Sequence, residues 1–193
     1  MLMTNENVRL MPHDHILAKL ILPLIPRSVH PNHVTILRLV LIPFVLLYFW
    51  REDWLMAMGL FLLAACTDAI DGSLARTRKQ ITMWGTMADP LADKLLIGST
   101  VLLFVAREIN PWFAAVIVII ELMIVAGAAY NRHLGRYSSA NEYGKIKMFL
   151  QCLGVVLLLV GKIAGIELAV PFAVGTFSVA IVFAIVSLLT YGL

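Results

Sequence analysis

Six apolar stretches, each approaching the roughly 20 residues needed to cross a bilayer, constrain the fold of this chain most strongly. They cover about residues 34–50, 54–76, 85–105, 111–130, 146–160 and 168–191. A backbone in lipid must satisfy its own hydrogen bonds, so continuous apolar runs predict helices. The chain is 61% hydrophobic and only 14% charged, whereas a soluble domain is about a quarter charged. We therefore predict an all-α integral membrane protein with six transmembrane helices.

The amino-terminal part, residues 1–30, differs from the rest. Residues 14–26 are apolar, but this segment is too short to span and is interrupted by Pro23 and Pro26. We expect a helix lying in the membrane interface, with a cytoplasmic helix packed on the bundle as the alternative. The polar start predicts no cleavable signal peptide. The expected domains are a cytoplasmic tail with the interfacial helix, 1–30, and a membrane domain, 31–193.

Charge is distributed unevenly between the two ends of the predicted spans. The ends with few basic residues hold Arg51, Arg107 and Lys162, each near an acidic residue. Most basic residues fall on the other side: Arg9, Lys19, Arg27, Arg76, Arg78, Lys79, Arg132, Arg136 and Lys145. The positive-inside rule then places both termini in the cytoplasm. The net charge of +3 reflects topology and contact with anionic lipid, and no basic stripe with interleaved aromatic residues favours nucleic-acid binding.

Four aspartates interrupt the apolar pattern at the ends of the second and third stretches. Asp68 and Asp71 are three residues apart, and Asp89 and Asp93 are four apart, so each pair shares one helical face. A polar turn between the two helices would bring these faces together. Carboxylates so close repel one another unless cations lie between them. An oxygen-only ligand set suits magnesium, calcium or manganese, so we predict a site for one or two divalent cations.

The spacing of these residues fits the pattern D-x-x-D-G-x-x-A-R-x8-G-x3-D-x3-D at every fixed position, from Asp68 to Asp93. It resembles the signature of the CDP-alcohol phosphotransferase family. The resemblance implies an enzyme that joins an alcohol to a CDP-linked lipid and releases CMP. It also implies two divalent cations, Mg²⁺ or Mn²⁺, and a homodimer.

The same resemblance suggests roles for the signature residues. Asp68, Asp71 and Asp89 would bind metal, and Asp93 would be the general base and a further metal ligand. Small residues would let the nucleotide approach the helix backbone, and Arg76 offers phosphate a bidentate donor. The expected nucleotide-binding residues within the signature are Asp68, Gly72, Ala75, Arg76 and Gly85.

A second match opens the first span, where Pro31 to Arg38 reads P-N-x-x-T-x-x-R. It resembles the start of the glycerophosphate and cardiolipin branches of the family. The resemblance places Asn32 and Thr35 at the nucleotide, although Asn32 is also suited to an N-cap. Arg38 is expected to bind acceptor phosphate, and the alternative is that it snorkels to the interface.

A third match, Gly144 to Lys147, opens the fifth span and resembles the G-K-x-K segment of the glycerophosphate branch. That branch usually carries Arg-Glu in the fourth span, where this chain has Ile120 and Glu121. We expect Glu121 to be a structural partner of Arg38 or Lys94. The expected acceptor-phosphate residues are Arg38, Lys94, Arg132, Arg136, Lys145 and Lys147.

The resemblance implies transfer of a phosphatidyl group from CDP-diacylglycerol to a small phosphorylated alcohol in the bacterial inner membrane, and the charge asymmetry predicts an active site that faces the cytoplasm. The preferred acceptor is sn-glycerol 3-phosphate, which gives phosphatidylglycerophosphate and CMP. The alternative acceptor is phosphatidylglycerol, which gives cardiolipin. A secondary transporter would also place aspartates within spans, but it would be expected to show inverted repeats, and the acidic motif occurs once in this sequence.

Overall fold

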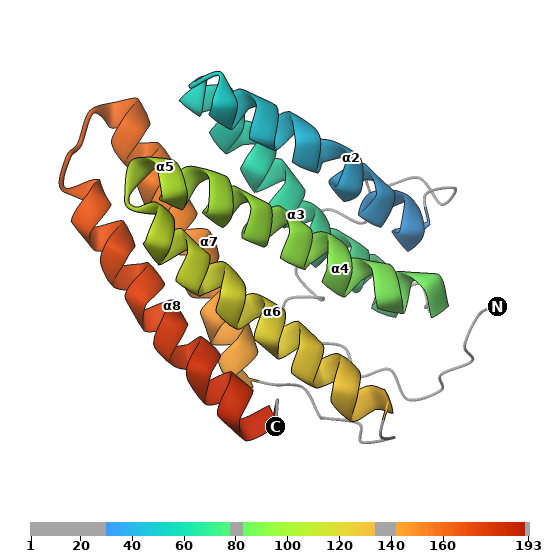
Figure 1. Ribbon diagram of the computed structural model, residues 1–193. Helices are drawn as coiled ribbons and strands as arrows, with labels where there is room; N and C mark the ends of the chain where they lie inside the picture. Colours follow the sequence, from blue (N-terminus) through green and yellow to red (C-terminus); the bar gives the residue numbers. More distant parts are fainter. Residues whose placement is uncertain (1–29, 78–82, 134–141, 192–193) are drawn as a thin grey trace. The chain divides into compact units, whose positions relative to one another are not determined.

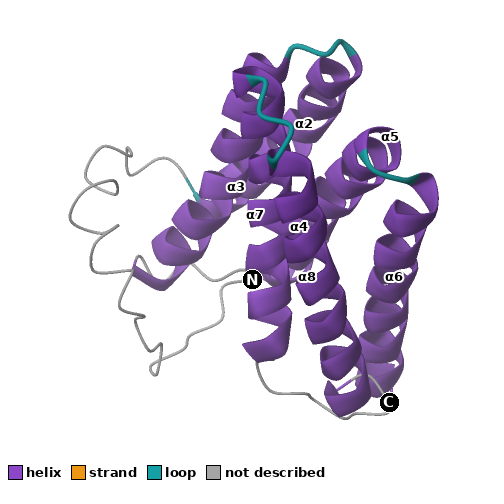
Figure 2. Ribbon diagram, turned by 90° about the vertical axis from the view of Figure 1, so that its left-hand side faces the viewer, coloured by secondary structure: helices purple, strands orange, loops and turns teal. Residues whose placement is uncertain are grey.

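The computed structural model describes residues 30–77, 83–133 and 142–191, and helix is the only regular secondary structure in these ranges (Figure 2). The prediction of an all-α protein is therefore confirmed for this part of the chain. The interfacial helix expected over 14–26 lies outside the described residues. The helices are α2 (Pro31–Trp50), α3 (Trp54–Thr77), α4 (Met83–Thr100), α5 (Ala106–Glu108), α6 (Pro111–His133), α7 (Glu142–Ala164) and α8 (Ala169–Tyr191), with the π-helical segment η2 (Val101–Val105) between α4 and α5.

The six predicted apolar stretches coincide with helical segments of the structure. Four helices of the described part are long and apolar enough, over Asn32–Trp50, Pro111–Asn131, Glu142–Ala164 and Ala169–Thr190. In α3 the described apolar stretch covers Trp54–Thr67. Several apolar helices of spanning length are typical of an integral membrane protein.

The first helix begins earlier than the sequence suggested. Its N-cap is His30, so Asn32 lies within the first turn, and the alternative that Asn32 caps the helix is wrong. Pro31 occupies the first helical position, where its fixed φ suits a helix and its missing N–H is not needed. The backbone N–H of His30 donates to Nδ1 of His33 at 3.4 Å.

Two backbone positions with positive φ shape the turns at one end of the helices. Glu52, between α2 and α3, has φ 60°, and Gly165, after α7, has φ 67°. The N–H of Ile166 donates to the carbonyl of Gly161 at 2.9 Å, which is the six-to-one bond of a Schellman motif. A glycine after the last helical residue permits this left-handed ending without a Cβ clash.

The chain divides into two compact units, which are described separately. The first comprises residues 1–51 and 56–96, and the second comprises residues 52–55 and 97–193. The first unit therefore holds α2, nearly all of α3 and the larger part of α4. Its buried apolar residues include Val45, Phe49, Phe61, Leu74 and Leu96.

In the second unit, α7 and α8 run side by side along their lengths (Figure 1). Small residues allow this close approach. A Cβ added at Gly154 would lie 2.7 Å from Cζ of Phe177, and one added at Gly161 would clash with Cβ of Ala169. Helices in membranes associate through such small-residue contacts, because lipid removes the hydrophobic driving force between them.

Candidate functional site

The four signature aspartates lie on the two helices that the sequence predicted, one pair before and one pair after the segment that connects these helices. Asp68 and Asp71 lie in the last turns of α3, and Asp89 and Asp93 lie in the middle part of α4. Because both segments are α-helical, each pair occupies one helical face. The side chains of Asp89 and Asp93 are half-buried, whereas those of Asp68 and Asp71 lie outside what the structure describes. All four residues belong to the first unit.

The donor chemistry of this segment fits a hard divalent cation. Carboxylate oxygens are the ligands that magnesium and manganese prefer. Among the side chains that the structure describes, no group of three or more ligand residues forms, since two of the four aspartates are outside that set. What the structure supplies is Asp89 and Asp93, two carboxylates one turn apart on α4.

A hydrogen bond from α2 reaches one of these carboxylates. The hydroxyl of Thr35 donates to Oδ1 of Asp89 at 2.6 Å, and the Thr35 side chain is 1% exposed. The sequence placed Thr35 near the nucleotide but did not pair it with an aspartate. The bond joins residues 54 positions apart and fixes the start of α2 against α4.

A second bond from α2 reaches α3 beside the first aspartate pair. Nε of Arg38 donates to the hydroxyl of Thr67 at 3.1 Å, and the Thr67 hydroxyl donates to the carbonyl of Ala64 at 2.6 Å. Arg38 is 0% exposed, so the alternative that it snorkels to an aqueous interface is wrong. Thr67 directly precedes Asp68, and the sequence interpretation gave it no role.

The remaining residues expected at the nucleotide lie on the helices that carry the aspartates or on α2. Asn32 is half-buried in the first turn of α2. The positions of Gly72, Ala75 and Arg76 fall in the last turns of α3, and Gly85 falls in the first turn of α4. The backbone at these positions is helical, and the Arg76 side chain lies outside what the structure describes.

The basic residues expected at the acceptor lie on several helices. Lys94 is exposed on α4. Arg132 lies at the end of α6, and Arg136 is outside the described residues. Lys145 and Lys147 lie in the first turns of α7, within the second unit.

The two lysines of α7 have different partners. Nζ of Lys147 forms an ion pair with Oε1 of Glu121 at 2.5 Å, with side-chain exposures of 9% and 17%. Nε2 of Gln151 donates to the same carboxylate at 3.0 Å. The structure thus gives Glu121 partners on α7, where the sequence had suggested Arg38 or Lys94. Lys145 pairs with Glu142 at 2.7 Å on an exposed surface.

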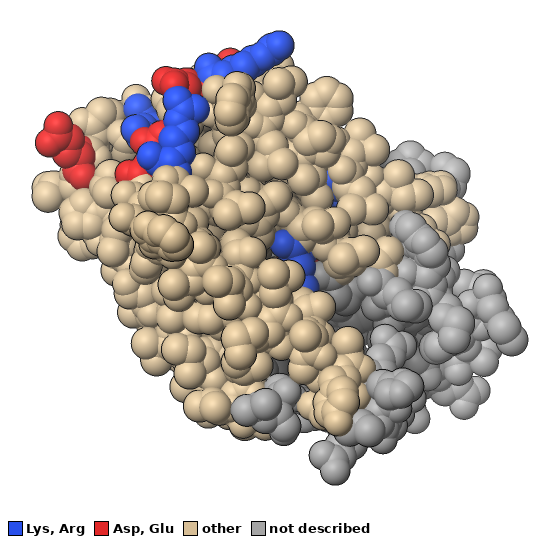
Figure 3. Space-filling model, in the orientation of Figure 1, with Lys and Arg blue, Asp and Glu red and all other residues tan. Residues whose placement is uncertain are grey.

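A separate group of charges lies in the second unit, at the helix ends that hold the turns described above. Arg107 pairs with Glu52 and Glu108, and Lys162 pairs with Glu108. Nζ of Lys162 also lies 5.6 Å from the ring centroid of Trp54, within reach of a cation–π interaction. Figure 3 shows blue and red side chains gathered near the top of the view, with a smaller blue patch near its middle.

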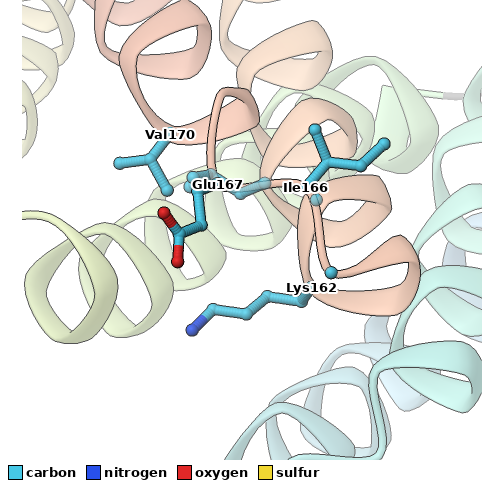
Figure 4. A pocket seen from close by; sticks show the side chains of 7 residues that line it. Lys162, Ile166, Glu167 and Val170 are labelled. Atoms are coloured by element: carbon cyan, nitrogen blue, oxygen red, sulfur yellow. The ribbon is translucent and has the colours of Figure 1, made fainter.

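A pocket of about 270 Å³ adjoins this charged group at the turn between α7 and α8. Its lining is mostly apolar, and the charged ends of Lys162, in the last turn of α7, and of Glu167, in the following turn, lie on the same side of the view (Figure 4). The sequence placed Lys162 near Glu167, but the ion pair of Lys162 is with Glu108. None of the lining residues belongs to the aspartate signature: Leu158, Gly161, Lys162, Gly165, Ile166, Glu167 and Val170.

Comparison with known proteins supports the resemblance that the signature suggested. The sequence profile of the CDP-alcohol phosphatidyltransferase family matches residues 28–190. A protein of Bacillus subtilis named CDP-diacylglycerol–glycerol-3-phosphate 3-phosphatidyltransferase is 32% identical over 173 residues, which cover 81% of this chain and 90% of the relative.

Two further relatives carry the same name. The protein of Pseudomonas fluorescens is 37% identical over 138 residues, covering 67% of this chain and 71% of the relative. The protein of Rickettsia felis is 32% identical over 136 residues, covering 68% of this chain and 75% of the relative. The profile match extends over nearly the whole chain. It contains all the described helices, apart from Tyr191 at the end of α8. This chain is therefore a member of the CDP-alcohol phosphatidyltransferase family.

Proposed function

We propose that this protein transfers a phosphatidyl group from CDP-diacylglycerol to sn-glycerol 3-phosphate and releases CMP. The complete aspartate signature on α3 and α4 is the observation that carries the proposal. The relatives named for this reaction support it, because they share 31–37% identity with the chain. The buried contacts of α2 with Asp89 and with Thr67 support a polar site among the first three described helices.

In the proposed reaction, a free hydroxyl oxygen of glycerol 3-phosphate attacks the phosphorus that bears the diacylglycerol. The bond from that phosphorus to the CMP oxygen breaks, and CMP leaves with the electron pair. Asp93 accepts the proton of the attacking hydroxyl, as a positioned carboxylate does in general base catalysis. Arg76 binds phosphate oxygens, and Gly72, Ala75 and Gly85 leave room for the nucleotide along the helices.

Asp68, Asp71, Asp89 and Asp93 would hold two divalent cations, Mg²⁺ or Mn²⁺. When bound, such cations neutralise the negative charge of a pyrophosphate and stabilise the leaving group. Asn32 at the start of α2 would contact the nucleotide, and Thr35, one turn further on, would lie at the same end of the site behind Asp89. This assignment follows from the oxygen-only donor set and from the half-buried positions of Asp89 and Asp93.

We propose sn-glycerol 3-phosphate as the acceptor on the basis of the basic residues expected to bind its phosphate. A phosphorylated acceptor needs basic partners, and the candidates are Arg38, Lys94, Arg132, Arg136, Lys145 and Lys147. The glycerophosphate branch usually has an arginine where this chain has Ile120 on α6. Lys147, two residues after the exposed Lys145, keeps an ammonium group in a largely buried position through its pair with Glu121.

Topology and assembly are proposed on the same basis. Six spans would place both termini and the aspartate helices on the cytoplasmic side of a bacterial inner membrane, because most basic residues fall there. CDP-diacylglycerol would then keep its acyl chains in the bilayer while its headgroup reaches the aspartates. A homodimer is the proposed assembly. Cysteine accessibility to a membrane-impermeant reagent at the two ends of α3 would test the orientation.

Product analysis distinguishes the proposed acceptor from the alternative. The purified full-length protein in detergent is incubated with CDP-diacylglycerol and Mg²⁺ or Mn²⁺, separately with glycerol 3-phosphate, phosphatidylglycerol, inositol phosphate and serine. Formation of phosphatidylglycerophosphate with the first acceptor alone is the expected result. Formation of cardiolipin from phosphatidylglycerol would overturn the acceptor assignment and retain the reaction class. Absence of product with every acceptor, in protein that unfolds cooperatively on heating, would overturn the reaction itself.

A further inference from the structure

Helix α2 contributes hydrogen-bond donors to both helices that carry the aspartates. Thr35 donates to Oδ1 of Asp89 on α4, and Arg38 donates to Thr67 on α3, the residue before Asp68. Thr35 and Arg38 are three residues apart and therefore share one face of α2. Both side chains are buried, at 1% and 0% exposure. One face of α2 thus contacts Asp89 of the second aspartate pair directly. The same face contacts Thr67, the residue next to Asp68 of the first pair.

The hydrogen bond from Thr35 to Asp89 has the short length of a charge-assisted hydrogen bond. Its oxygen–oxygen distance of 2.6 Å is typical of a hydroxyl that donates to an ionised carboxylate. Because Thr35 is almost fully buried, water does not readily replace its hydroxyl. The terminal torsion of an aspartate has broad, shallow preferences, so a fixed donor on one oxygen sets the rotation of the carboxylate.

Other threonine hydroxyls of the described helices behave differently. The hydroxyls of Thr67, Thr176 and Thr190 donate to carbonyl oxygens three or four residues earlier in their own helices. Such local bonds use the hydroxyl hydrogen within the threonine's own helix. The Thr35 hydroxyl instead reaches a carboxylate on another helix, at a residue of the signature.

We infer that Thr35 is a positioning residue for metal binding: its hydroxyl orients the carboxylate of Asp89, and it acts through that carboxylate. The inference rests on the proposed function, in which Asp89 is a metal ligand. Partners that orient a ligand typically affect metal affinity about 10–100-fold when removed. Arg38 and Thr67 support this arrangement by fixing the same face of α2 beside Asp68.

The test measures binding of Mn²⁺ alone to purified full-length protein in detergent, without lipid substrate. Electron paramagnetic resonance reports the free Mn²⁺ during a titration and needs no catalysis. Thr35→Val keeps the shape of the side chain and removes the hydroxyl, while Thr35→Ser keeps the hydroxyl. Thr100→Val is the matched control, because Thr100 is also fully buried on α4 and its hydroxyl has no hydrogen-bond partner in the described part of the chain. Asp89→Asn removes the carboxylate itself.

The inference predicts about 10–100-fold weaker Mn²⁺ binding for Thr35→Val, with Thr35→Ser and Thr100→Val close to wild type. In the Asp89→Asn background, Thr35→Val is expected to cause no further loss, since both changes act on one interaction. If Thr35→Val does not fold, as judged by thermal unfolding, Thr35→Ala takes its place and the same loss is expected.

Three results would overturn the inference in distinguishable ways. Wild-type affinity in Thr35→Val, with binding lost in Asp89→Asn, would remove the positioning role and keep the proposed metal site. Equal losses in Thr35→Ser and Thr35→Val would show that shape, and not the hydroxyl, matters. Absence of Mn²⁺ binding by the folded wild-type protein would overturn the metal site of the proposed function together with the inference. In the first of these cases, a raised KM for CDP-diacylglycerol would assign Thr35 to direct contact with the nucleotide.

Discussion

Two helix contacts in this protein are built from opposite kinds of residue. The contact of α2 with α3 and α4 contains a buried arginine, two buried threonines and an aspartate joined by hydrogen bonds. The contact of α7 with α8 is made of glycine, alanine and apolar side chains, such as Gly154 against Phe177. The first lies around the signature residues, and the second contains none of them.

The difference shows which contact serves chemistry and which serves stability. Polar and ionisable groups within a membrane protein are expensive to bury and tend to mark functional pathways. Small residues packed against one another need no polar partner and depend only on fit. Changes in the first contact should therefore affect activity more than folding, and changes in the second should do the reverse.

The largest effect is expected at Asp93, in the first contact region. Asp93→Asn keeps the size of the side chain but removes its ability to accept a proton. The rate of CMP release should fall by about 10²–10⁴-fold, the range for loss of a general base. Steady-state kinetics at saturating CDP-diacylglycerol would measure this, with thermal unfolding as the control for folding. A variant that retains near wild-type kcat would exclude Asp93 as the base.

The second unit also contains a largely buried ion pair, between Lys147 and Glu121, whose contribution to stability can be tested. Lys147→Met leaves the largely buried carboxylate of Glu121 without its cation, which typically costs about 3–5 kcal/mol of stability. Lys145→Met is the matched control, since its pair with Glu142 is exposed and is worth about 0–1 kcal/mol. Thermal or denaturant unfolding in detergent would measure both.

A second change separates the structural role of Lys147 from acceptor binding. In Lys147→Met with Glu121→Gln the unpaired charge is gone, and stability should recover while the amide still accepts from Gln151. If Lys147 also binds acceptor phosphate, the KM for glycerol 3-phosphate stays raised in this double variant. A KM restored together with stability would assign Lys147 to structure alone.

Gly161 tests the small-residue contact of α7 with α8. Gly161→Ala adds a Cβ that clashes with Ala169 and lies 3.1 Å from the carbonyl oxygen of Ile166, so the turn must shift. Overpacking of this kind costs about 1–3 kcal/mol. Gly175→Ala on α8 is the control, because a Cβ there meets nothing within 4 Å. Equal melting temperatures for the two variants would contradict the account of this contact, and activity per folded molecule should change in neither.

The smallest effect is expected at the exposed ion pairs near the α2–α3 turn. Arg107→Gln removes pairs whose side chains are partly exposed, with Arg107 at 41% and Glu52 at 56%. Such pairs contribute about 0–1 kcal/mol, and salt screens them. The melting temperature should fall slightly at low salt and the difference should shrink at high salt. A large, salt-independent loss would show that this group stabilises the fold more than exposure suggests.

The sequence predicted the helices well because apolar length and the aspartate spacing are local properties. All six helical segments lie where the apolar runs predicted them, and the signature indicated the family. The start of α2 was placed too late, because His30 is an uncommon N-cap and Asn32 a common one. The six-span topology stays a prediction, because four helices of the described part are long and apolar enough to cross a membrane.

Partners distant in sequence could not be predicted. Glu121 binds Lys147 and Gln151, and Lys162 binds Glu108 although Glu167 is nearer in sequence. Such pairs depend on how helices are rotated against one another, which the spacing within one helix does not determine. The bond from Thr35 to Asp89 is of the same kind, because it joins two helices that are separated in the chain by a third.

The most direct test of the proposed reaction follows CMP and lipid product together. Purified full-length protein, CDP-diacylglycerol and Mg²⁺ are mixed, and glycerol 3-phosphate is then added while CMP and phosphatidylglycerophosphate are quantified over time. We expect CMP to appear only after the acceptor is added, and in an amount equal to that of phosphatidylglycerophosphate. Release of CMP without acceptor, or no CMP from folded protein that binds Mn²⁺, would contradict the assignment of these aspartate-bearing helices to phosphatidyl transfer to glycerol 3-phosphate.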